Sequence, residues 1–79
     1  MLIKIQYFSL LRDLKGPDSI EMADGSTVGD LLRTLFDQVS GLSAWNKHLL
    51  VAAGIEWVPR EYILRPDDLI SLMPPVQGG

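Results

Sequence analysis

The chain opens with a regular alternation of apolar and polar side chains. Residues 2–8 read Leu-Ile-Lys-Ile-Gln-Tyr-Phe, the period of two that is typical of a strand with one buried face. The alternation predicts that Ile3, Ile5 and Tyr7 share that face. Residues 18–23 alternate in the same way, and we expect them to form a second strand paired with the first.

The hydrophobic period changes between these two segments. Within residues 9–15, Leu10, Leu11 and Leu14 have the spacing of a short helical turn. Gly16-Pro17 follows, and this pair is typical of a break between elements. We therefore expect one short helical turn between the first two strands.

The strongest periodic pattern predicts an amphipathic helix. Asp24-Gly25 indicates a turn, and either Ser26 or Thr27 can cap the helix that follows. Ser40-Gly41 is expected to end it, because glycine accepts the left-handed conformation that closes helices. The apolar stripe, with the spacing i, i+3, i+4, i+7, i+8 and i+11, consists of Val28, Leu31, Leu32, Leu35, Phe36 and Val39, and the solvent side holds Arg33, Asp37 and Gln38.

The second half of the chain predicts three more strands. Residues 49–53 form a compact apolar run, and Trp57-Val58 fits a short edge strand that Pro59 stops. A final strand over residues 69–73 would turn Ile70 and Leu72 inward. Residues 42–48, around Trp45, fit a second short helix.

This order of elements indicates an α+β domain. One amphipathic helix buries its stripe most simply by packing across one face of a mixed sheet. The order strand, strand, helix, then three strands is that of the ubiquitin-like β-grasp fold. We expect residues 1–73 to form this domain and residues 74–79 to form a flexible C-terminal reactive tail.

The composition excludes several kinds of functional site and partner. None of the 79 residues is cysteine, which excludes disulfides, thiolate metal sites, cysteine nucleophiles and side-chain persulfides. The net charge is −3, with the basic residues scattered, so we expect no nucleic-acid partner. No apolar run approaches the length of a membrane span, and we expect a cytoplasmic protein with no membrane partner.

The last six residues hold the most distinctive motif. They read Pro74-Pro75-Val76-Gln77-Gly78-Gly79. Two prolines end strand pairing, and six extended residues span at most about 20–22 Å, enough to reach into a neighbouring protein. Two glycines suit a narrow channel because they have no Cβ. The motif predicts a carboxylate at Gly79 that a partner enzyme activates as an acyl-adenylate and that a sulfur donor converts to a thiocarboxylate.

Other candidate sites are weaker. His48 is the one histidine, and no nucleophile motif adjoins it. Asp67-Asp68 supplies too few ligands for a cation site and is more typical of a polar turn. We interpret Trp45 and Trp57 as residues that pack in the core or at its edge. The sequence therefore predicts no metal site, no bound cofactor and no catalytic side chain.

Three stretches resemble the small subunit of molybdopterin synthase, a family of ubiquitin-like sulfur carriers that also includes the carrier of thiazole synthesis. The opening strand leads into Leu-Arg-Asp-Leu-Lys-Gly, similar to the family's Arg-Glu-Leu-x-Gly turn. Thr-Val-Gly-Asp-Leu-Leu lies where the family's main helix starts. Asp-Leu-Ile-Ser-Leu-Met-Pro-Pro-Val-Gln-Gly-Gly is close to the family's ending, Pro-Pro-Val-x-Gly-Gly, and is the most specific of the three.

The resemblance implies roles for particular residues. Gly79 would be adenylated by an ATP-dependent, ubiquitin-activating-like enzyme and would receive sulfur from a sulfur donor protein. Gly78 and residues 74–77 would thread into the large subunit of a heterotetrameric synthase, where the sulfur passes to a cyclic pyranopterin phosphate. Phe8 and Met73 would belong to an apolar patch that both partners bind, with Arg12 beside it. Glycyl adenylate and thiocarboxylate would be covalent intermediates.

Two alternative functions stay open at this point. The chain could carry sulfur for thiazole, cysteine or transfer-RNA thiolation. It could also be a ubiquitin-like interaction module that binds through its sheet and never reacts. Phe8 and Met73 could then be ordinary packing residues, and Arg12 a solvated charge.

Overall fold

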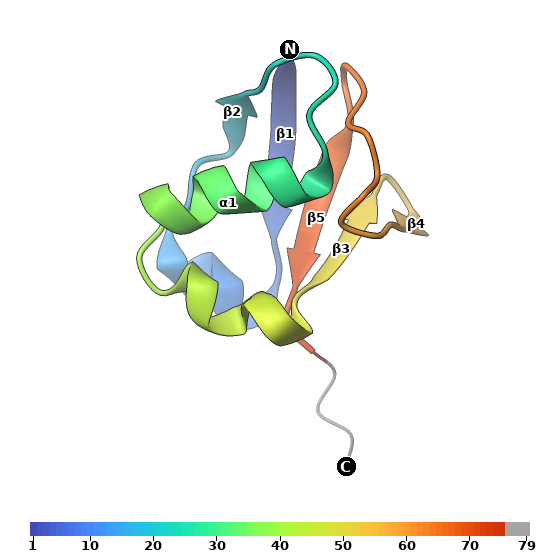
Figure 1. The fold of residues 1–79 in the computed structure, drawn as a ribbon. Helices are drawn as coiled ribbons and strands as arrows, with labels where there is room; N and C mark the ends of the chain where they lie inside the picture. Colours follow the sequence, from blue (N-terminus) through green and yellow to red (C-terminus); the bar gives the residue numbers. More distant parts are fainter. Residues whose placement is uncertain (76–79) are drawn as a thin grey trace.

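A mixed sheet with one α-helix across it forms the body of the protein (Figure 1). The structure is a computed structural model and describes residues 1–75. The sheet has five strands in the order β2-β1-β5-β3-β4. The strands are β1 (Leu2–Tyr7), β2 (Ser19–Glu21), β3 (Leu50–Ala53), β4 (Glu56–Trp57) and β5 (Leu69–Met73); the helices are α1 (Val28–Gln38) and two 3-10 helices, η1 (Ser9–Leu14) and η2 (Leu42–His48).

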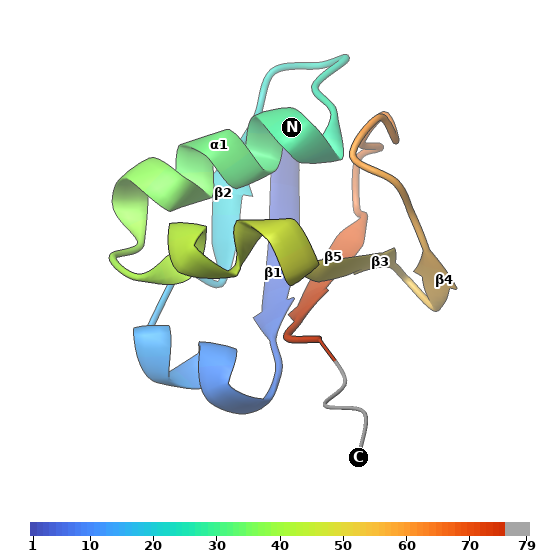
Figure 2. The ribbon, with the colours of Figure 1, turned by 60° about the horizontal axis from the view of Figure 1, so that its bottom comes forward.

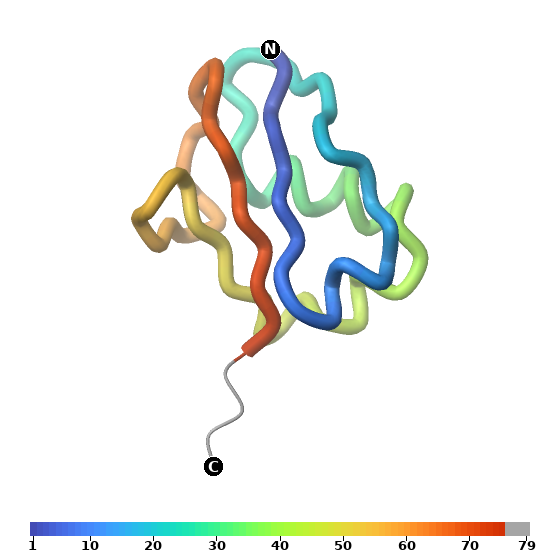
Figure 3. The backbone as a smooth tube through the Cα atoms, turned by 180° about the vertical axis from the view of Figure 1, so that it is seen from behind, coloured from blue at the N-terminus to red at the C-terminus, as the bar shows by residue number. Residues whose placement is uncertain are grey.

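The sheet is antiparallel except at its centre. There β1 and β5 run parallel, with Ile5 opposite Ile70 and Tyr7 opposite Leu72. The α1 helix crosses one face, and η2 lies beside it on the same side (Figure 2). In the view from behind, no helix lies over the opposite face in the part of the chain that the structure describes (Figure 3). We call this the uncovered face.

The core lies between the sheet and α1. Ile3 and Ile5 alternate into it from β1, as their spacing predicts, and the apolar stripe of α1 covers them. Burial of each such side chain stabilises the fold by about 1.5–3 kcal/mol. The fully buried large side chains are Ile3, Leu11, Val28, Leu31, Leu32, Leu35, Leu42, Ile70 and Leu72.

A capping box fixes the start of α1. Thr27 Oγ1 accepts a hydrogen bond from the Asp30 N–H at 3.2 Å, and Asp30 Oδ2 accepts one from the Thr27 N–H at 3.0 Å. The hydrogen bond from the Thr27 backbone is the main reason that the pKa of Asp30 is lowered. Of the two capping residues that the sequence allows, the cap is therefore Thr27.

Some element ends differ from the sequence prediction. The α1 helix ends at Gln38, because Val39 is already extended, and the left-handed Gly41 instead begins η2. Lys15, with φ of 56°, closes η1 in place of Gly16-Pro17. The second strand is shorter than expected, covering Ser19–Glu21 rather than residues 18–23. The predicted order of elements and the mixed sheet with one main helix are confirmed.

A polar turn leads into β5, where Asp67-Asp68 was predicted to form one. The Asp68 carboxylate accepts hydrogen bonds from the Tyr62 hydroxyl at 3.0 Å and from the Arg65 N–H at 2.9 Å. Asp67 is left-handed, with φ of 71°. Through these two hydrogen bonds, the Asp68 carboxylate orders the chain just before β5.

Candidate functional site

The tail begins where the central strand ends. The β5 strand finishes at Met73, and Pro74 and Pro75 follow it half-buried, without strand pairing. The described residues do not include Val76, Gln77, Gly78 and Gly79. The expectation of a flexible tail concerns these residues and therefore also lies outside what the structure describes. The structure therefore describes the surface around the start of the tail.

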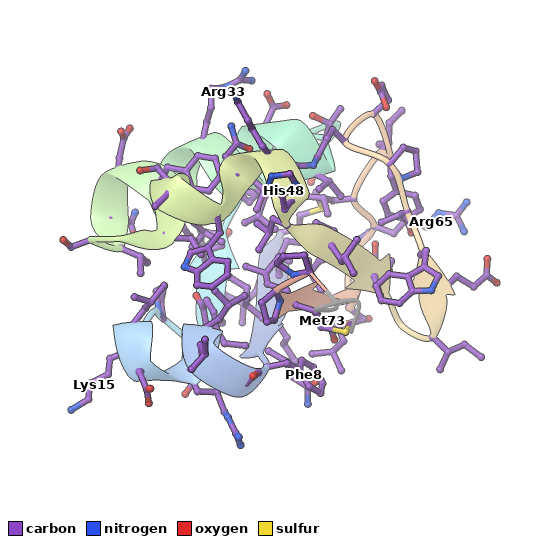
Figure 4. All side chains as sticks on the ribbon, turned by 90° about the horizontal axis from the view of Figure 1, so that it is seen from below. Phe8, Lys15, Arg33, His48, Arg65 and Met73 are labelled. Atoms are coloured by element: carbon purple, nitrogen blue, oxygen red, sulfur yellow. The ribbon has the colours of Figure 1, made fainter. Side chains whose placement is uncertain are left out.

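Phe8 lies beside Met73 at this point. Because β1 and β5 are parallel, they finish at the same end of the sheet, with Tyr7 opposite Leu72. The Phe8 N–H continues the pairing and donates a hydrogen bond to the Leu72 carbonyl at 3.0 Å. Viewed from below, Phe8 and Met73 are neighbours on the side away from α1 (Figure 4).

The strand register assigns further side chains to the uncovered face. Tyr7 and Leu72 point toward the core, so the next residues along each strand, Phe8 and Met73, point to the other face. Leu50 is the register partner of Met73 and shares that face. Trp57 belongs there as well, through its partner Ala52. We call Phe8, Leu50, Trp57 and Met73 the apolar patch.

Two members of the apolar patch are exposed to solvent. The exposed fractions are 43% for Phe8 and 63% for Trp57. Of the core and edge positions that we expected for Trp57, the structure shows the edge position, because β4 is an edge strand and α1 does not cover this face. Sequence reasoning missed Trp57 and Leu50, since only the register between β3, β4 and β5 shows that they join Phe8 and Met73.

Arg12 projects from η1, the segment that directly follows Phe8. Leu11 anchors this helix in the core, and its N–H donates a hydrogen bond to the Phe8 carbonyl at 3.1 Å. The helix also contacts β5. Ser9 and Lys15, at its two ends, are both left-handed, with φ of 57° and 56°, which costs roughly 1–2 kcal/mol per residue. Arg12 is exposed on this helix, which follows Phe8 and contacts the strand that leads into the tail.

Tyr7 fixes the return of the chain from η1 to β2. Its hydroxyl donates a hydrogen bond to the Pro17 carbonyl at 2.9 Å. Burial, and secondarily the negative charge of Asp18, raise the pKa of Tyr7 to about 12. A Cβ at Gly16 would overlap the Tyr7 ring and hydroxyl, so this position needs glycine for space.

Within residues 1–75, other candidate sites would be pockets or clusters of metal-ligand side chains. His48 is exposed, and the described residues hold neither a cavity nor a group of three side chains suited to a metal ion. The only α-helix among them has 11 residues, and no helix there is long and apolar enough to cross a membrane.

Comparison with known proteins identifies a family for nearly the whole chain. Residues 5–79 match the ThiS family. The match includes the last two glycines as well as most of the folded body.

Solved structures share the fold. SAMP1 from Haloferax volcanii superposes with a TM-score of 0.84 at 24% identity, over 100% of both chains. A putative molybdopterin converting factor subunit 1 from Pyrococcus furiosus gives 0.82 at 24% identity, over 95% of this chain and 98% of that one. A chain in a complex of subunits 1 and 2 of molybdopterin-converting factor from Helicobacter pylori gives 0.67 at 24% identity, over 100% of both chains. These likenesses confirm the ubiquitin-like β-grasp fold.

Proposed function

The chain belongs to the ThiS family of ubiquitin-like sulfur carriers, and from this membership we propose that it carries sulfur as a thiocarboxylate on Gly79. The observation that carries the proposal is the extent of the family match, which runs through residues 78 and 79. The proposal requires Gly79 to be the C-terminal residue of the active protein.

The proposed chemistry uses partners for every catalytic step. An ATP-dependent activating enzyme converts the Gly79 carboxylate to an acyl-adenylate, because a free carboxylate is a poor electrophile. A sulfur donor protein then displaces AMP and leaves the thiocarboxylate. The folded body presents the tail, and no side chain of this chain acts as an acid or base. No bound cofactor takes part, and a cytoplasmic location suits a reaction that consumes ATP.

We propose molybdopterin synthesis as the pathway, with this chain as the small subunit of the synthase. The Pro-Pro-Val spacer supports this choice, as does the fold likeness to a protein described as subunit 1 of molybdopterin-converting factor. Residues 74–78 would enter the large subunit, and the apolar patch and Arg12 would contact its surface. The sulfur on Gly79 would pass to a cyclic pyranopterin phosphate.

Reconstitution tests the pathway. The thiocarboxylated protein is incubated with a synthase large subunit and the pterin precursor, and molybdopterin is measured. We expect molybdopterin to form with the full chain and not with a variant that lacks Gly79. If the thiocarboxylate forms but no molybdopterin appears, the carrier serves another pathway, such as thiazole, cysteine or transfer-RNA thiolation. If no thiocarboxylate forms, the chain is an interaction module.

A further inference from the structure

A polar pair lies beside the apolar patch on the uncovered face. Gln6 of β1 and Ser71 of β5 are register partners, and Ser71 Oγ donates a hydrogen bond to Gln6 Oε1 at 3.2 Å. Ser71 is only 4% exposed, whereas Gln6 is exposed. The buried hydroxyl of Ser71 is therefore hydrogen-bonded to the exposed side-chain amide of Gln6.

In the structure, the oxygen end of the Gln6 amide faces Ser71. A glutamine side chain has one carbonyl oxygen, which accepts, and one NH2 group, which donates twice. Because Gln6 Oε1 turns toward Ser71, Nε2 turns away from it. Within residues 1–75, the bond to Ser71 is the one side-chain hydrogen bond that Gln6 makes. The pair thus presents two hydrogen-bond donors at a defined place on the surface.

The pair lies within reach of any partner that binds the tail. Gln6 is two residues before Phe8 and Ser71 is two residues before Met73, a separation of about 7 Å along each strand. The tail that follows Met73 has six residues and spans at most about 20–22 Å, so a protein that receives Gly79 must approach this end of the sheet. A surface that covers Phe8 and Met73 and continues about 7 Å along the strands would also cover Gln6.

Covering Gln6 imposes a requirement on that partner. An apolar surface placed over Nε2 would remove two donors from water without giving them acceptors, which is unfavourable. A surface that offers an oxygen there would gain a hydrogen bond in an otherwise apolar contact. Such a pair would favour, among partners that fit the apolar patch equally well, one with an oxygen at this place.

We propose that Gln6 determines partner specificity by donating from Nε2 to a carbonyl or carboxylate oxygen on the synthase large subunit, with Ser71 as the residue that positions it. This inference rests on the proposed function, because it takes the large subunit as the protein that covers the uncovered face.

The test measures the Kd between the large subunit and variants of the full 79-residue chain. Gln6→Glu keeps the shape of the side chain but replaces the donors with acceptors, and we expect Kd to rise about tenfold or more. Gln6→Leu should raise Kd by a similar factor, because it leaves the partner's oxygen unpaired. Gln38→Glu is the matched control, since Gln38 is also exposed but belongs to α1 on the opposite side of the sheet, and its Kd should stay within twofold.

Ser71→Ala tests the positioning role. We expect a smaller rise in Kd than for Gln6→Leu, together with faster motion of the Gln6 NH2 group in the free protein, measured by nuclear magnetic resonance relaxation. A loss of packing alone would not change the motion of that amide. In the wild-type complex, the resonances of this NH2 group should shift when the large subunit binds.

The outcomes separate the inference from the proposed function. If the wild-type chain binds the large subunit and both Gln6 variants bind within twofold of it, or if Gln6→Leu binds more tightly, the inference is wrong and the proposed function stands. If the wild-type chain does not bind the large subunit, the proposed pathway is wrong. If a second copy of the chain occupies the uncovered face instead, so that dimerisation and not subunit binding depends on Gln6, the assignment of the partner is wrong.

Discussion

The Phe8 N–H donates a hydrogen bond to the Leu72 carbonyl at 3.0 Å, one residue beyond the last register pair of β1 and β5. This bond joins the ends of the two central strands and holds Phe8 beside Met73. Because the tail follows Met73 directly, the same bond places an exposed aromatic side chain next to the start of the tail. Phe8 and Met73, two members of the apolar patch, are therefore held together at the ends of the two central strands.

The exposed members of the apolar patch should matter for binding and not for folding. Phe8→Ala and Trp57→Ala should each weaken binding of the synthase large subunit about tenfold, because truncating an aromatic side chain that anchors an interface costs about 1–2 kcal/mol or more. Ile63→Ala is the control, since Ile63 is exposed to a similar degree (59%) but lies next to the start of α1. Isothermal titration calorimetry measures the affinities. Equal losses for all three variants would contradict a role for the apolar patch.

Gly16 should tolerate no side chain. A Cβ at Gly16 overlaps Tyr7, whereas a Cβ at Gly29 in α1 meets its neighbours at 3.5 Å or more, an ordinary contact. Gly16→Ala should lower the free energy of unfolding by about 1–3 kcal/mol through overpacking. Gly29→Ala should be neutral or stabilise by up to about 1 kcal/mol, because alanine favours the helix. Urea unfolding checks both values, and equal effects would show that the Tyr7 contact is not the cause.

The cap of α1 should contribute measurably to stability. Thr27→Ala removes one half of the capping box and should lower the free energy of unfolding by about 1–2 kcal/mol. Thr34→Ala is the matched control: Thr34 Oγ1 donates to the Asp30 carbonyl inside the helix, a bond of little net value there. The midpoint of thermal unfolding distinguishes the two variants. A larger shift for Thr34→Ala would contradict the assigned cap.

Stability should fall at alkaline pH because of Tyr7. Its pKa is raised from 10.0 to about 12 in the folded protein, so folding favours the protonated phenol. The contribution is fully present below pH 10 and is lost as the pH rises toward about 12. Tyr7→Phe should flatten this decline in urea unfolding measured across that range. Some decline should persist in the variant, because the pKa of Tyr62 is also raised. An unchanged decline in Tyr7→Phe would refute the role of Tyr7.

The sequence predicted the elements whose pattern is local. The stripe of α1 and the alternation of β1 depend on residues a few positions apart, and both have the predicted burial. Element ends were less accurate. Lys15 adopts the left-handed conformation at a position where a side chain makes it costly, because the buried Leu11 and the Tyr7–Pro17 hydrogen bond hold the segment in place.

The candidate site could be predicted only in part. Phe8, Met73 and Arg12 were expected near the tail from a family resemblance. Trp57 joins them through Ala52 and β5, a relation between strands that no local pattern contains. The pairing of Gln6 with Ser71 joins residues 65 positions apart and also depends on the parallel register of β1 and β5. A surface formed by side chains from several strands can be predicted only when the order and register of those strands are known.

The central claim is that the α-carboxylate of Gly79 receives the sulfur. Its most direct test is intact and fragment mass spectrometry of the chain after incubation with ATP, an activating enzyme and a sulfur donor. We predict that one oxygen is replaced by one sulfur, that fragmentation assigns the change to Gly79, and that a chain lacking Gly79 gains nothing. An unchanged mass under conditions in which the enzyme thiocarboxylates another carrier, or sulfur on any other residue, would contradict the claim.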